Sequence, residues 1–230
     1  MFDFLTESVF FGAFISLLFY EAGLYCKRRW KYAFLNPLLI SIILTIALLA
    51  VLHVDYETYY AGARYISYLL TPATICLAIP LYEQFELLKK NYLAVIGGIV
   101  SGVVTSVVLV LVLAIILGFS HSEYVTFLPK SVTTAIGMSI SEQLGGYVPV
   151  TVAVIIITGV LGNIMAEPVC RIFRITDPIA KGVGIGSASH AIGTSKAMEM
   201  GEIEGAMSGL SIAVAGILTV FASIIFSMIY

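Results

Sequence analysis

The chain has 230 residues, of which 60% are hydrophobic and 11% are charged, and its formal net charge is −2. The charged share is about half of that in ordinary globular domains, and the slightly negative balance excludes a nucleic-acid partner. A soluble core could not bury so much uninterrupted apolar sequence. The composition therefore predicts an all-α polytopic membrane protein, with residues 1–230 forming a single integral membrane domain.

Apolar runs without Lys, Arg, Asp or Glu predict most of the membrane helices. The longest runs exceed the roughly 20 residues that cross the hydrocarbon core of a bilayer. A shorter run carries two prolines, and another is interrupted only by Glu21. Together they predict about six to eight segments, some broken or re-entrant. The long runs are Tyr32–Val54, Asn91–Ser122, Leu144–Ala166 and Gly205–Tyr230, and the two weaker ones are Tyr65–Tyr82 and Val9–Tyr25.

The distribution of cations predicts the orientation. CKRRWK (Cys26–Lys31) carries four cations, so the positive-inside rule places it in the cytoplasm and the N-terminus outside. Leu128–Gln143 can either cross the membrane or dip in and return. The second alternative is favoured, because it places the three cations of CRIFRITDPIAK (Cys170–Lys181) in the cytoplasm as well.

Two segments share a weak internal similarity. Leu69–Gln84 and Leu128–Gln143 match at four of sixteen positions, and each precedes a long apolar run. Paired interrupted segments in two halves of a membrane protein indicate an inverted repeat around a transport site. An internal inverted repeat is therefore a hypothesis for this chain.

A broken membrane helix exposes N–H and C=O groups that hydrocarbon cannot satisfy, so a break is expected where it lines a wet cavity or is buried in protein. In TPATICLAIP, Pro72 and Pro80 interrupt the run, and Thr71 and Thr74 supply hydroxyls. The segment can line such a cavity. A kinked helix whose threonines bond back to their own turn explains the same pattern.

LPKSVTT is the second polar interruption. Pro129 breaks or starts a helix, and Lys130, Ser131, Thr133 and Thr134 follow it. An ammonium group and hydroxyls at a helix N-terminus are what a small carboxylate requires. The alternative is that Lys130 extends to the membrane interface at the end of the segment.

GIGSASHAIGTSKAMEMGE (Gly184–Glu202) is the third. Its glycines allow either unwinding of the chain or close packing of small residues, and Ser187, Ser189, His190 and Thr194 can line a cavity. His190 titrates near physiological pH and is a candidate for proton coupling; a structural histidine bonded to a carbonyl is the alternative.

No motif for catalysis or for a cofactor is present. The glycines are not spaced G-x-G-x-x-G after a strand, and both the Walker lysine motif and G-x-S-x-G are absent. The odd number of distant cysteines favours free thiols over a metal site. We therefore expect neither an enzyme nor a cofactor or metal, and we interpret Glu199, Glu202 and Glu204 as a solvated connection.

Four segments, in this order, resemble the LrgB/CidB family of bacterial membrane proteins: NPLL (Asn36–Leu39), PATICLAIPLYEQ (Pro72–Gln84), LPKSVTTAI (Leu128–Ile136) and GSASHAIGTSKAMEMGEIEGAMS (Gly186–Ser208). The resemblance implies a place in the bacterial plasma membrane and holin- or antiholin-like control of murein hydrolase activity, with a small LrgA/CidA-type partner. It also implies transport of small carboxylates, because the family resembles the C-terminal part of the plant plastid glycolate/glycerate transporter.

Broken segments with hydroxyls and a lysine suit a carrier better than a simple pore. We therefore predict a transporter of small monocarboxylates of the pyruvate, lactate, glycolate or glycerate type, which forms a homodimer in contact with lipid. The alternative is a regulatory, antiholin-like membrane protein without specific transport. The predicted substrate-binding residues are Thr71, Thr74, Pro129, Lys130, Ser131, Thr133, Thr134, Ser187, Ser189, His190 and Thr194.

Overall fold

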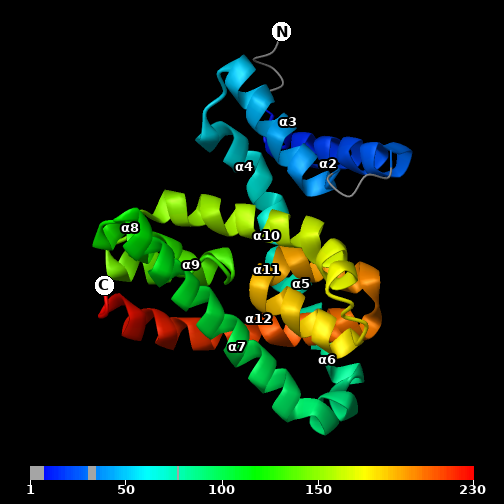
Figure 1. The fold of residues 1–230 in the computed structure, drawn as a ribbon. Coiled ribbons are helices and arrows are strands. Elements are labelled where there is room, and N and C mark those ends of the chain that lie inside the picture. Colours follow the sequence, from blue (N-terminus) through cyan, green and yellow to red (C-terminus); the bar gives the residue numbers. More distant parts are fainter. Residues whose placement is uncertain (1–7, 31–34, 77) are drawn as a thin grey trace. The chain divides into compact units, whose positions relative to one another are not determined.

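The computed structural model describes residues 8–30, 35–76 and 78–230, and every regular element within these ranges is an α-helix (Figure 1). The predicted all-α class is confirmed. The chain divides into two compact units, Met1–Cys76 and Leu77–Tyr230. Each unit is described by itself below.

The N-terminal unit packs α2 against α3 and α4. Asn36 caps α3 with its side-chain oxygen, which accepts hydrogen bonds from the amides of Leu38 (2.8 Å) and Leu39 (3.2 Å). Pro37 follows as the first helical residue, where a missing N–H costs nothing. Gly23 of α2 lies directly on the Pro37 backbone. The helices of this unit are α2 (Phe11–Trp30), α3 (Pro37–Leu52), α4 (Tyr56–Ser67) and α5 (Leu70–Cys76).

The C-terminal unit is built around three long apolar helices, α7, α10 and α12. Each is long and apolar enough to cross a membrane, which confirms a polytopic helical membrane protein. The helices of this unit are α6 (Ala78–Glu83), α7 (Phe85–Leu117), α8 (His121–Phe127), α9 (Thr134–Leu144), α10 (Val148–Ile172), α11 (Pro178–Met200) and α12 (Glu202–Ser227).

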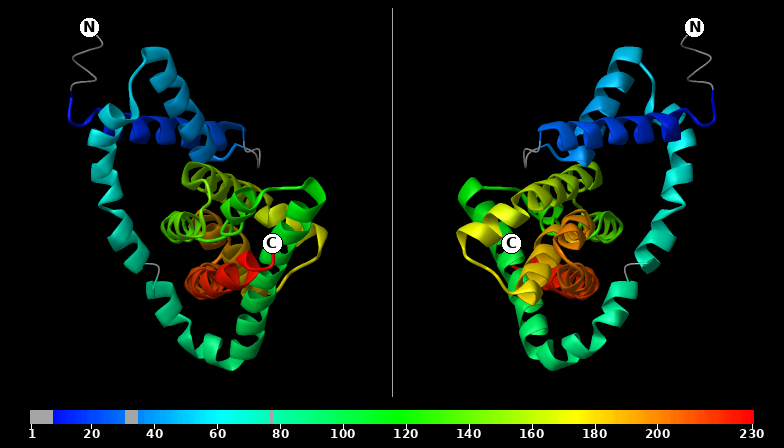
Figure 2. Two further views of the ribbon diagram at one scale, coloured as in Figure 1. Left: turned by 90° about the vertical axis from the view of Figure 1, so that its left-hand side faces the viewer. Right: turned by 90° about the vertical axis from the view of Figure 1, so that its right-hand side faces the viewer.

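Hydrogen bonds between helix ends fix the directions of these three helices. The Tyr230 hydroxyl, just after α12, donates to the Phe119 carbonyl at 2.6 Å, so α7 and α12 end together. The Thr151 hydroxyl, at the start of α10, donates to the Thr126 carbonyl of α8 at 3.0 Å. The helix α10 therefore begins where α7 ends and runs in the opposite direction, as Figures 1 and 2 also show.

Helices α8 and α9 form a short hairpin, interrupted at residues 128–133. The Tyr147 amide, just after α9, donates to the Thr126 hydroxyl of α8 at 2.8 Å, and Ser141 of α9 joins Thr126 through Thr151. The chain thus leaves Thr126 and returns to it, and at 11 residues α9 is too short to span a bilayer. We call residues 121–144 the first hairpin, and residues 129–133 its tip.

Helix α11 consists of two helices that meet at a kink and form a second hairpin. His190 has φ 43° and ψ −143°, which breaks the helix there. Lys181 and Glu199 line the same cavity, whereas a straight helix would separate them by roughly 27 Å. Figure 1 shows α11 on the side of the unit opposite the first hairpin. We call residues 178–200 the second hairpin, and His190 its tip.

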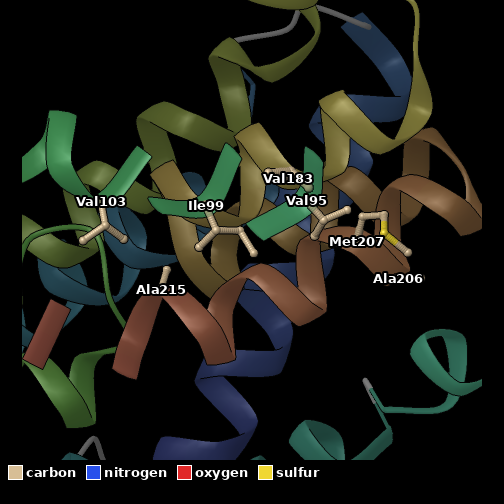
Figure 3. Packing of buried hydrophobic residues seen from close by; sticks show 7 residues of the cluster. All are labelled: Val95, Ile99, Val103, Val183, Ala206, Met207 and Ala215. Carbon is tan, nitrogen blue, oxygen red and sulfur yellow. The ribbon is translucent and has the colours of Figure 1, made fainter. Parts of the chain in front are cut away.

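The core of this unit joins α7, the second hairpin and α12. Val95, Ile99 and Val103 recur every four residues on α7 and are almost fully buried. They pack against Val183 of the second hairpin and Met207 of α12 (Figure 3). Because these three residues lie on one face of α7, the other faces of the helix are available for different contacts.

Candidate functional site

A cavity of about 400 Å³ lies between the middle of α7, the tip of the first hairpin and the flank of the second hairpin. It is open on one side, where Ser101 and Thr105 of α7 are exposed. Its lining is rich in hydroxyls and glycines: Gly98, Ser101, Gly102, Thr105, Ser106 and Leu109 of α7, Lys130 and Ser131 of the tip, and Gly184, Ser187 and Ala188 of the second hairpin.

Lys130 is the charged group of this cavity. It is the only Lys or Arg between Asn91 and Cys170, and the α7 residues beside it, Gly98–Leu109, lie at mid-helix. Its ammonium donates to the Ser131 hydroxyl at 2.9 Å. Within the part of the chain that the structure describes, no carboxylate forms an ion pair with it. Such a half-buried cation is costly at membrane depth unless an anion or water meets it.

The hydroxyls beside Lys130 differ in what they can still donate. Ser106 and Ser131 share one hydrogen bond of 3.2 Å between their oxygens, so one of their two hydroxyl protons is free for a ligand. The Ser187 hydroxyl donates to the Val183 carbonyl at 2.7 Å, and its oxygen can only accept. The ammonium and the Ser106–Ser131 pair are therefore the donors that an anion would meet.

The structure brings three of the predicted site residues, Lys130, Ser131 and Ser187, together around this cavity. Pro129 is buried beside them, and its carbonyl accepts from the Val132 amide at 3.3 Å. Thr133 and Thr134 begin α9 and are not among the residues that line the cavity.

Thr71 and Thr74 lie in α5 of the N-terminal unit. Their side chains are outside the described part of the structure. Their role in binding stays a prediction.

His190 is placed away from Lys130. Its ring Nε2 donates to the Ile155 carbonyl of α10 at 3.0 Å, and the ring is 3% exposed. The Thr194 hydroxyl closes the tip by donating to the His190 carbonyl at 3.0 Å and pairing with Ser208 at 2.7 Å. Ser189 lines a separate, apolar cavity beside α10. Proton coupling by His190 stays a prediction, and in this structure the ring has the alternative role of bonding a carbonyl.

The glycines of the second hairpin serve packing rather than unwinding. At Gly182 and Gly186 a methyl group would overlap the Glu204 and Ser208 carbonyl oxygens of α12. The backbone stays helical through them and breaks only at His190. The small residues therefore bring two helix backbones close together, as in other membrane helix pairs.

The acidic stretch after the second hairpin is not uniformly solvated, so our interpretation was wrong for one residue. Glu204 is 8% exposed, and its carboxylate lies 3.7 Å from the Lys181 ammonium. Glu199 pairs with Lys196 at 3.2 Å, and Glu202 is exposed. Lys181 lies near the start of α11 and Glu204 near the start of α12, so this ion pair links the two helices. The sequence pattern did not predict this contact.

The sequence analysis missed the contribution of α7. It treated Asn91–Ser122 as a plain span, yet Ser101, Thr105 and Ser106 place three hydroxyls in the cavity. A signal was available, because Gly98, Gly102 and Ser106 recur every four residues in an otherwise apolar run.

Three helices of membrane length, of which α10 runs antiparallel to α7 and α12, and two hairpins that enter from opposite ends define a helical membrane protein, and its polar cavity lies between α7 and the two hairpins. The LrgB-like family model matches residues 16–229, so the chain belongs to the LrgB-like family. It is 37% identical to an antiholin-like protein LrgB of Bacillus mycoides (strain KBAB4) over 216 residues, and 36% identical to that of Bacillus cereus (strain B4264), with 94% of each chain covered. No solved structure matches the chain.

Proposed function

We propose that this protein is a transporter of small monocarboxylates, of the pyruvate, lactate, glycolate or glycerate type. The observation that carries the proposal is the Lys130 ammonium, which lies at mid-depth in a hydroxyl-lined cavity without a carboxylate partner among the described residues. A monocarboxylate would supply the missing charge. Small size follows from a cavity of about 400 Å³ that α7 and both hairpins share.

The two hairpins support a carrier rather than an open pore. The first returns to the end of the unit where α7 finishes, and the second returns to the end where α7 begins. Interrupted segments that reach a midplane site from opposite sides are the usual construction of alternating-access transporters. The two hairpins, each followed by a long helix, are a different pairing from the predicted repeat of Leu69–Gln84 with Leu128–Gln143, which stays a hypothesis.

The orientation follows from the cations. Apart from Lys130, the Lys and Arg residues of the C-terminal unit lie where α7 begins and α10 ends: Lys89, Lys90, Arg171, Arg174, Lys181 and Lys196. The positive-inside rule favours a cytoplasmic location for this end of the unit in the bacterial plasma membrane.

The open side of the cavity exposes Ser101 and Thr105. At membrane depth these hydroxyls would meet water or be covered by protein, either a second copy of the chain or an LrgA/CidA-type partner.

Uptake into liposomes tests the proposal. Liposomes that contain the purified protein, with or without an LrgA/CidA-type partner, should take up labelled pyruvate, lactate, glycolate or glycerate. Liposomes without protein are the control and should take up none of them. Absence of flux for all four under both conditions would overturn it. Uptake by the His190→Gln variant, measured across pH, tests proton coupling separately: an unchanged pH profile would remove His190 from that role.

A second candidate is antiholin-like control of murein hydrolase activity, which the names of the curated relatives favour. Transport can underlie it, if carboxylate traffic changes the proton balance that governs autolysis. A cell carrying the Lys130→Met variant separates the two functions. If Lys130→Met changes autolysis as gene deletion does, control of murein hydrolase activity depends on the Lys130 cavity. If uptake is abolished while autolysis stays as in the wild type, this control is independent of transport.

A further inference from the structure

A second, larger cavity of about 720 Å³ lies at the cationic end, between the end of α10 and the base of the second hairpin. Arg171, Arg174 and Lys181 line it, together with Thr176. Arg171, Arg174 and Thr176 are exposed. This cavity is separate from the one around Lys130, and the proposed function does not use it.

The cations around this cavity differ in whether they have a carboxylate partner. Two carboxylates also line it, those of Glu167 and Glu199, but both are bonded to Lys196, at 3.0 and 3.2 Å. Lys181 has its own partner in Glu204. Arg171 and Arg174 form no ion pair within the residues that the structure describes. Asp177, the next residue after Thr176, caps α11 by accepting from the Ala180 amide at 2.8 Å. The two guanidinium groups are therefore the cations at the opening that an anion can meet.

A third cavity shares lining residues with the cationic cavity and with the Lys130 cavity. It has a volume of about 280 Å³ and shares Cys170 and Lys181 with the cationic cavity. At its other end it shares Gly184 and Ala188 with the Lys130 cavity. Both of these residues are small and exposed. The flank of the second hairpin thus forms one continuous edge from the cationic end to the ammonium of Lys130.

We propose that Arg171, Arg174 and Lys181 form a vestibule that collects small carboxylates, and that Gly184 and Ala188 mark their path to Lys130. The nature of the collected anion rests on the proposed function, whereas the positive vestibule and the path do not. Clefts lined by one sign of charge raise the local concentration of the opposite ion and its rate of association. The alternative is that these cations serve only to set the orientation of the helices in the membrane.

Charge-selective labelling tests the vestibule without any transport measurement. Thr176→Cys is introduced after Cys26, Cys76 and Cys170 are replaced by Ser, and the thiol is treated with negative or positive methanethiosulfonate reagents of equal size. We expect the negative reagent to react roughly fivefold faster than the positive one, and this preference should fall as the salt concentration rises.

The preference should vanish in the double variant Arg171→Gln/Arg174→Gln, and it should persist in Arg171→Lys/Arg174→Lys. Gln143→Cys, at the opposite end, is the control site and should show no such preference. Equal rates at Thr176→Cys, or a preference unchanged by the Gln pair, would overturn the vestibule.

The same labelling in liposomes identifies the anion. With neutral phosphatidylcholine alone, millimolar pyruvate should slow the negative reagent at Thr176→Cys. If pyruvate has no effect, and phosphatidylglycerol instead abolishes the preference, a lipid headgroup occupies the vestibule and the carboxylate assignment is wrong.

Transport kinetics test the path. Arg171→Gln/Arg174→Gln should raise the apparent KM from the cationic side about fivefold with kcat kept, and Ala188→Phe should stop uptake while leaving the labelling preference intact. Unaltered uptake by Ala188→Phe would overturn the path. If the wild type moves no carboxylate but the labelling preference holds, the proposed function fails and the vestibule stands.

Discussion

The two hairpins of the C-terminal unit handle their polar residues in opposite ways. The first hairpin turns its tip toward the cavity, and Lys130 meets only a neighbouring hydroxyl there. The second hairpin closes its own tip, because the His190 ring and the Thr194 hydroxyl find partners inside the protein. It offers the cavity its flank instead, through Gly184, Ser187 and Ala188.

This difference gives the two hairpins different roles: the first offers groups for binding, and the second supports the structure. Donors are available at the first tip, where a ligand can use them, whereas the side chains of Ser187, His190 and Thr194 in the second hairpin already have partners in the protein. Polar sequence within a membrane segment therefore does not by itself mark a ligand contact. What matters is whether the fold leaves a donor without a protein partner.

The largest effect is expected at the first tip. Lys130→Met should lower carboxylate uptake at least about 100-fold, because the charge that holds the anion is lost. Lys130→Arg keeps the charge and should retain part of the activity. Size-exclusion profiles and melting temperatures of the two variants provide the folding control. Unchanged uptake by Lys130→Met would remove Lys130 from the site.

The scaffold role of the second hairpin is tested by two glycines that are two residues apart and lie on different faces of the helix. Gly186→Ala should lower the free energy of unfolding by about 1–3 kcal/mol, because its methyl group would overlap the Ser208 carbonyl. Gly184→Ala is the matched control, since no atom lies within 4 Å of the added methyl group. Thermal unfolding in detergent measures both. Equal melting temperatures would contradict the close packing of α11 on α12.

Two serines that line the same cavity should respond differently. Ser131→Ala should raise the apparent KM about three- to tenfold, because the hydroxyl that accepts from the Lys130 ammonium and bonds Ser106 is lost. Ser187→Ala should change the KM less than about twofold, since the Ser187 proton already bonds the Val183 carbonyl. The reverse order in a liposome uptake assay would show that the second hairpin supplies the donor.

The smallest effect is expected inside the second hairpin. A double-mutant cycle with Thr194→Val and Ser208→Ala should give a coupling energy of about 0.6 kcal/mol in thermal unfolding, as is typical of hydrogen bonds between membrane helices. Thr194→Val should leave the KM within twofold of the wild type. A larger rise in KM would place Thr194 in contact with the substrate.

Composition alone predicted the class of this protein, because apolar runs of membrane length have few other uses. The LPKSVTT interruption was also predictable, since a proline followed by a lysine and hydroxyls cannot continue a lipid-facing helix. The position of the break in α11 was not. The glycines allowed either unwinding or close packing and did not indicate where a break would fall, and the helix breaks at His190, a residue type with only a modest enrichment at positive φ.

The sequence by itself determined the helices, their membrane length and the segments that are interrupted, because these depend on local composition and on the energetic cost of unsatisfied backbone in hydrocarbon. Only the tertiary structure decided which polar groups remain available. Whether Ser131 or His190 has a partner beyond its own segment depends on Ser106 of α7 and on Ile155 of α10, which lie far away along the chain. A hydrogen bond that satisfies a group across such a distance leaves no trace in its neighbouring residues.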